Sequence, residues 1–250
     1  MTRTINRIPI MLAVTLSLAA FPACKRNNEA KERVQAQWVH MGEEFEDSLE
    51  SIEKRTESVK NEISVLNEEA DRLLPKFKYV ENPREVEGYY IYKSWASTYP
   101  LKTTSLVMRL TKGEKAELIA ALSGGAHFNR IRVTAGGKTA ESGTVPHDQA
   151  LNYRMEGLNT VCFSDSASDS CAKLIADYSG DDVTIQYLDG DRKTGELKYP
   201  AKSKEALTDS WRLYDARRRA AHDERLLTKL AKEHEMYAER LQNYYDNPRR

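Results

Sequence analysis

The sequence predicts an α+β protein: a small, mostly antiparallel β domain with a short helix, inserted between two long amphipathic helices that form an antiparallel coiled-coil stalk. Three observations predict this fold. Apolar residues at heptad spacing run from about residue 29 to residue 77. Short alternating runs separated by glycine turns fill residues 79–200. Helical spacing then returns from about residue 203 to residue 246.

The first 23 residues have the features of an export signal. Arg3 and Arg7 give a positive start, and the apolar run from Ile8 to Ala20 is too short to span a bilayer. The run ends in Phe21-Pro22-Ala23-Cys24, which resembles the lipobox of bacterial lipoproteins. The resemblance covers only this leader. It implies cleavage before Cys24, a lipid such as palmitate on that cysteine, and an outer-membrane anchor facing the periplasm. An ordinary secretory signal is the alternative.

The first long helix is predicted from a stripe of larger side chains. Gaps of four and three residues alternate along it, with one extra gap of four, and polar residues fill the other faces. Pro75 is expected to stop the helix, because proline cannot continue a helix interior. The stripe consists of Val34, Trp38, Met41, Phe45, Leu49, Ile52, Thr56, Val59, Ile63, Leu66, Ala70, Leu73 and Phe77.

The middle of the chain is predicted to be rich in strands. An aromatic segment, residues 89–99, opens it and is interpreted as a strand with its packing, or alternatively as a platform for sugar rings. Residues 117–123 could be a strand or a short helix, and residues 138–150 are expected to form a surface loop. Further strands are expected at 105–110, 128–135, 151–163 with a break near Gly157, 183–188 and 195–199. Gly136-Gly137 is a predicted hairpin turn.

Two cysteines in the middle suggest a structural disulfide. An exported chain with three cysteines is expected to use Cys24 for the lipid and to pair Cys162 with Cys171. Cys171 begins a helical pattern that Asp169 or Ser170 is expected to cap. The bridge would attach this short helix to the preceding strand. A redox-active pair is the alternative, but the spacing is not that of a Cys-x-x-Cys motif.

Helical spacing returns near the C-terminus. Leu207, Trp211 and Tyr214 begin a second apolar stripe, and the predicted helix nearly equals the first in length. An antiparallel pair within one chain fits these lengths, although the helix could fold back on the β domain or pair between chains. The expected domains are therefore the signal, 1–23; the anchor and first helix, 24–78; the β-rich domain, 79–200; and the last helix, 201–250.

Charge and motifs narrow the function classes. The chain has 38 basic and 38 acidic residues, and the mature form without Arg3 and Arg7 has a net charge of −2, so nucleic acid is not expected as a partner. The chain contains no metalloprotease, hydrolase-elbow or phosphate-loop motif. The histidines are scattered along the sequence, at His40, His127, His147, His222 and His234. No catalytic residue, cofactor or metal is therefore predicted.

Two function hypotheses follow from these features. The favoured one is a non-enzymatic, lipid-anchored envelope protein that attaches to the membrane through its N-terminal lipid. Its helical stalk would present the β domain to an envelope protein or to peptidoglycan, and the long helices could also form a homo-oligomer. The alternative is an envelope enzyme or glycan-binding module that uses the β domain, with residues 89–99 or 140–150 lining a cleft.

Overall fold

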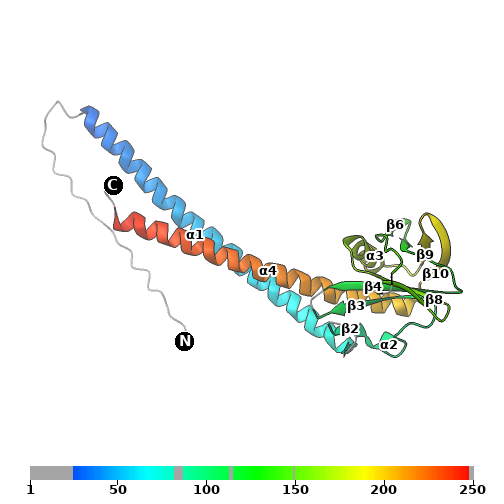
Figure 1. Cartoon of the computed structure of the whole chain (residues 1–250). Helices are drawn as coiled ribbons and strands as arrows, with labels where there is room; N and C mark the ends of the chain where they lie inside the picture. Colours follow the sequence, from blue (N-terminus) through cyan, green and yellow to red (C-terminus); the bar gives the residue numbers. More distant parts are fainter. Residues whose placement is uncertain (1–24, 82–86, 113–114, 149, 248–250) are drawn as a thin grey trace. The chain divides into compact units, whose positions relative to one another are not determined.

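The computed structural model describes residues 25–81, 87–112, 115–148 and 150–247 (Figure 1). The chain divides into two compact units. We name Met1–Ser51 with Glu235–Arg250 the helical unit, and Ile52–His234 the β unit. The predicted combination of long helices at both ends of the chain with antiparallel sheet between them is confirmed: α1 spans Lys25–Leu73 and α4 spans Ala201–Asp246.

Aromatic side chains hold the helical unit together. The ring of Trp38 in α1 stacks on the ring of Tyr244 in α4, with 4.5 Å between the centroids, and the Tyr244 hydroxyl donates a 2.7 Å hydrogen bond to the Trp38 carbonyl. Phe45 meets Tyr237 and Tyr244 at 6.4 Å each. A Cβ at Gly42 would lie 2.9 Å from the Tyr244 ring, so the glycine makes room for this contact.

In the β unit, α1 ends where the sequence predicts a stop. The helix closes at Leu73, and a 3-10 turn, η1 (Leu74–Lys76), contains Pro75. Leu66, Ala70 and Leu73 of the predicted stripe are buried in this unit. The proline therefore separates the helix from the first strand, as a residue without a backbone N–H must.

The β unit contains two antiparallel sheets (Figure 1). Sheet A has the order β1-β2-β3-β4-β8-β7, and sheet B has the order β10-β9-β5-β6. The strands of sheet A are β1 (Phe77–Val80), β2 (Tyr89–Tyr92), β3 (Ser105–Thr111), β4 (Ala116–Ser123), β7 (Asn152–Met155) and β8 (Leu158–Phe163). Those of sheet B are β5 (Arg130–Ala135), β6 (Lys138–Glu141), β9 (Val183–Asp189) and β10 (Arg192–Lys198).

Two buried tyrosines connect the sheets. The Tyr187 hydroxyl of β9 donates a 3.1 Å hydrogen bond to the Ser105 carbonyl of β3, and the Tyr199 hydroxyl donates a 3.0 Å bond to the neighbouring Leu106 carbonyl. Burial raises the pKa of Tyr187 and that of Tyr199 well above the usual range of a phenol. Backbone carbonyls thus satisfy the hydroxyl groups of both buried tyrosines.

The structure corrects two local expectations and decides a third that was open. The predicted loop at 138–150 begins with strand β6, because Gly136 and Gly137 both adopt the positive φ of a tight hairpin turn. The short helix after β8, α3 (Ser166–Asp177), begins earlier than expected, because Asp165 caps it by accepting a 2.6 Å bond from the Ser168 N–H. The ambiguous segment 117–123 is strand β4.

Candidate functional site

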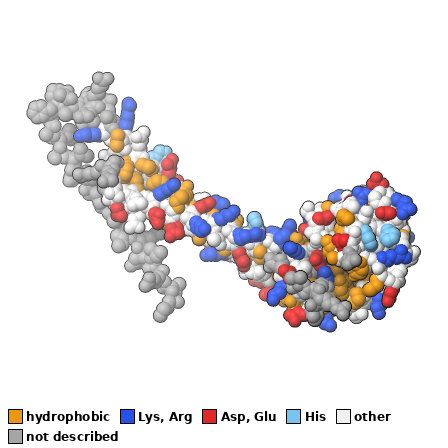
Figure 2. All heavy atoms as spheres, viewed as in Figure 1, with side chains coloured by type: hydrophobic (Ala, Val, Ile, Leu, Met, Phe, Trp, Pro, Cys, Tyr) orange, Lys and Arg blue, Asp and Glu red, His pale blue; other side chains and the backbone are white. Residues whose placement is uncertain are grey.

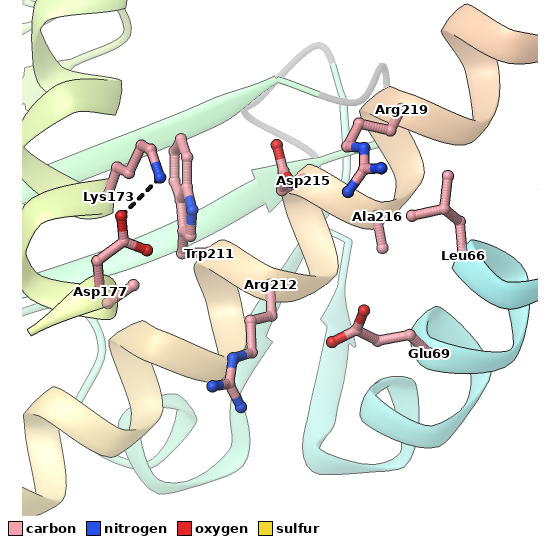
Figure 3. Close-up of a pocket in the computed structure, with 10 residues that line it drawn as sticks. Leu66, Glu69, Lys173, Asp177, Trp211, Arg212, Asp215, Ala216 and Arg219 are labelled. Atoms are coloured by element: carbon pink, nitrogen blue, oxygen red, sulfur yellow. Dashed lines mark hydrogen bonds and ion pairs between the residues drawn. The ribbon is translucent and has the colours of Figure 1, made fainter. Parts of the chain in front are cut away.

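A groove of about 410 Å³ lies between α1, α3 and α4 of the β unit (Figure 3). Five of its residues fall on one face of α4, because they recur at the three- and four-residue separations that bring side chains to the same side of a helix. Leu66 and Glu69 come from α1. The full lining is Leu66, Glu69, Lys173, Ala176, Asp177, Trp211, Arg212, Asp215, Ala216 and Arg219.

Buried apolar groups form part of the groove wall. Leu66, Trp211 and Ala216 are 4%, 7% and 2% exposed. The Trp211 ring packs against Tyr214 with 5.4 Å between the centroids, and the Tyr214 hydroxyl donates a 3.2 Å bond to Asp169 of α3. Partial burial raises the pKa of the Asp169 carboxyl, and the bond from Tyr214 opposes that shift. These contacts fix α3 against α4.

The rim of the groove carries three basic and three acidic side chains. Lys173 pairs with Asp177 at 2.6 Å, which is the dashed contact in Figure 3. Asp215 pairs with Arg218 at 2.8 Å, and Arg219 pairs with Glu62 of α1. Such exposed pairs contribute about 0–1 kcal/mol each, so a ligand can displace them at low cost.

Arg212 differs from the other cations of the groove. It is exposed, and among the described residues it has no ion-pair partner. A guanidinium presents several N–H donors in a fixed plane and suits a carboxylate or phosphate oxygen pair. The arrangement of an aromatic wall, mixed charges and one unpaired guanidinium is suited to binding a segment that carries both apolar and charged groups.

The residues predicted from the sequence lie elsewhere. Cys24 falls outside the described residues. Cys171 is fully buried in α3, where burial raises the pKa of its thiol to about 12. Cys162 lies on β8 and is half-buried, and in the described part of the chain no disulfide joins the two.

The two cysteines lie on different elements, Cys162 on β8 and Cys171 in α3. Val161 and Phe163 are fully buried and point to one face, so Cys162 points to the other. Asn159 shares the face of Val161 and Phe163 and donates a bond to the Phe128 carbonyl, next to sheet B. Helix α3 packs on β5 and β6 of that sheet and also contacts β4 of sheet A. The predicted bridge stays a prediction, which an intact-mass measurement before and after reduction decides.

In the aromatic segment 89–99, two of the five rings are buried and three are half-buried. Tyr89 and Trp95 are 4% and 6% exposed, and the Tyr89 ring meets Tyr99 at 5.7 Å. The Tyr89 and Trp95 rings therefore serve packing, which is one of the two interpretations expected for this segment. A second hollow, of about 320 Å³, lies beside Tyr99 and is also lined by Ile119 and Tyr153.

Sequence reasoning missed the groove. It identified Trp211 only as part of a stripe, although Arg212, Asp215 and Arg219 recur next to it at helical spacing. That spacing was the available signal, but a single helix face does not reveal which other helices border it.

None of the helices in the described part of the chain is both long and apolar enough to cross a membrane. The described residues also contain no cluster of three or more histidine, cysteine, aspartate or glutamate side chains suited to a metal ion. Comparison of the chain with protein-family models, with curated proteins and with solved structures finds no match.

Proposed function

We propose that this chain is a lipid-anchored protein of the bacterial cell envelope that acts by binding, not by catalysis. Cys24 carries the lipid, α1 and α4 pair as an antiparallel coiled coil, and the β unit presents a binding surface to another envelope protein. The anchor rests on the lipobox-like leader. The binding role rests on one observation above all, the three-helix groove with its unpaired Arg212.

Contacts within each unit support the helix pairing. In the helical unit, Trp38 of α1 contacts Tyr244 of α4, and Phe45 contacts Tyr237. The two α1 residues are seven positions apart, and so are the two α4 residues. In the β unit, Glu53 lies 3.5 Å from His234, and Glu62 pairs with Arg219. In both sets the α4 residue number falls as the α1 number rises, which is the order of an antiparallel pair. Residues at heptad separation are those that meet repeatedly along a coiled coil.

The chemistry of the groove favours a protein segment as the partner. Its rim balances cations against anions, and its wall combines Trp211 with aliphatic carbons. A ligand of a single charge sign would meet like charges as well as opposite ones. A polypeptide segment can match both signs and fill the apolar wall, and a central tryptophan with arginine is typical of interface anchors.

The second candidate is an envelope enzyme or a glycan-binding module. The hollow beside Tyr99 and Tyr153 favours it, because aromatic faces can stack on sugar rings. A panel of cell-wall glycans tested on the full chain distinguishes the two. Binding or turnover that depends on Tyr153 favours this candidate. If no glycan of the panel is bound or turned over, the candidate is ruled out.

We expect Cys24→Ser to move the protein from the membrane fraction to the soluble fraction and to abolish labelling with a palmitate analogue, because the proposed anchor is the lipid on that cysteine. In-cell crosslinking of the wild type should join Lys60 to Lys229 or Lys232 of α4, since Lys60 lies beside Leu227 and Leu230. Mixing isotopically light and heavy chains separates links within one chain from links between chains. Membrane retention of the unlipidated variant would contradict the anchor.

Reversing the charge of Arg212 tests the groove. We expect Arg212→Glu to reduce the recovery of a crosslinked partner at least tenfold, because a carboxylate of the partner would then face a like charge. Lys202→Glu is the matched control: it makes the same charge change at an exposed position of the same helix. Equal partner recovery from both variants would place the binding surface elsewhere.

A further inference from the structure

We propose that His127 and His147 form a two-imidazole site for a divalent transition metal ion of the Zn²⁺, Ni²⁺ or Cu²⁺ class. The sequence separates these histidines by twenty positions and predicted no metal. The fold brings their rings to 6.0 Å between centroids, at 83° to one another. Both side chains are exposed, and Figure 2 shows histidines next to one another on the surface of the β unit.

The ring separation suits a shared ion. A metal–nitrogen bond of about 2.0–2.1 Å, with the ring centre about 1.1 Å behind the nitrogen, places each centroid about 3.2 Å from the metal. The centroids of two such rings lie about 5.2 Å apart when the angle at the metal is tetrahedral. They lie about 6.4 Å apart when the rings oppose each other across the ion. The observed 6.0 Å falls between these limits. The centroid separation therefore matches a shared ion, toward which rotation about the side-chain bonds would turn one nitrogen of each ring.

Two buried asparagines hold the backbone beneath the pair. The Asn152 side-chain amide donates bonds of 3.3 Å to the Phe128 carbonyl and 2.9 Å to the Val145 carbonyl. Asn159 donates a further 3.2 Å bond to the Phe128 carbonyl, and the Val145 N–H bonds to Asn129 at 2.9 Å.

These bonds connect the two segments that carry the histidines. Phe128 directly follows His127, and Val145 lies two residues before His147. Both asparagines are almost fully buried, at 2% and 0% exposure. The backbone that carries the two histidines is thus fixed by core residues. This lowers the conformational entropy that the chain loses when it binds a metal.

The donor set limits what the site binds. No third histidine, cysteine or acidic side chain completes a cluster with the pair among the described residues. Imidazole nitrogens suit zinc, copper and nickel better than magnesium or calcium. Two protein ligands leave coordination positions for water or for a donor atom of another molecule. This site shares no residue with the groove at Trp211 and Arg212. The metal proposal and the groove proposal can therefore be refuted separately.

The test is calorimetric titration of the purified full chain with Zn²⁺, Ni²⁺ and Cu²⁺ salts. We expect saturable binding of one ion by this pair, with Cu²⁺ tighter than Ni²⁺, as the general order of divalent metals predicts. His127→Gln and His147→Gln should each weaken that binding at least tenfold. His222→Gln, an exposed histidine of α4, is the matched control and should leave it unchanged.

Zn²⁺-induced shifts in the imidazole NMR signals provide a second readout, because both rings must respond together. Circular dichroism spectra that match the wild type verify the fold of each variant. Binding that survives either substitution, or that depends on only one of the two histidines, overturns the proposal. So does the absence of a metal-dependent heat or shift.

Discussion

The free energy of unfolding is expected to fall steeply above pH 10, because two buried tyrosines cannot ionise in the folded state. Burial raises the pKa of Tyr187 and that of Tyr199 above the ordinary value of 10.0. The unfolded chain therefore loses two phenolic protons at a pH where the folded chain keeps them. Their contribution to stability is full below pH 10 and is lost as the pH rises toward the folded values, by about 2.7 kcal/mol per pH unit for the two together.

Denaturant unfolding at a series of pH values measures this slope, and the last two tyrosinates should form together with the loss of far-ultraviolet circular dichroism. Tyr187→Phe is the matched control. It removes the hydroxyl that bonds to the Ser105 carbonyl, which costs about 1 kcal/mol at neutral pH. It should also halve the alkaline slope that the tyrosines cause. Tyrosinate formation for all tyrosines before unfolding would show that the two phenols are accessible.

Replacing Lys76 by methionine is expected to destabilise the β unit by about 2 kcal/mol, because it leaves a buried carboxylate without its counter-ion. Lys76 donates a 2.7 Å bond to Asp209, whose side chain is only 9% exposed. The other described hydrogen bond to that carboxylate comes from Tyr92, at 3.3 Å. The expected cost is below that of a fully buried pair, since the lysine side chain is 44% exposed and water reaches it.

Asp209→Asn is the comparison for this pair. It should cost less than Lys76→Met, because the asparagine still accepts the Tyr92 bond and the exposed ammonium group is hydrated. The hydrogen bond to Asp209 raises the pKa of Lys76 above its ordinary 10.5, so its stabilising effect is full below that pH and is lost as the pH rises further. A double-mutant cycle with both single variants and the double variant measures the interaction free energy between Lys76 and Asp209. Equal costs for the two single variants would contradict the asymmetry.

The local signals in the sequence predicted elements well where one face of an element is buried. Ile131 and Val133 alternate with Arg130 and Arg132, and the structure buries the first pair in sheet B. The glycine pair at 136–137 predicted the hairpin, since positive φ at both positions is a local property of the chain. The start of α3 was missed because Asp165 and Asp169 are both plausible caps, and the choice depends on how β8 enters the helix.

Strand order and side-chain neighbours could not be predicted in this way. The pairing of β8 with β4 joins segments about forty residues apart, and nothing in either segment specifies the other. The same limit applied to the cysteines. The cysteine count predicts a bridge between Cys162 and Cys171, but whether the two sulfurs meet depends on how α3 packs against the strands, which the sequence does not specify.

By itself, the sequence determined the two long helices, the alternating strands and the lipobox-like leader, because periodicity and turn residues act over a few positions. Only the tertiary structure decided which charges border Trp211 and that His127 meets His147. Both sites join side chains from separate elements. Their proximity results from packing that the whole core determines, and no short stretch of the chain contains that information.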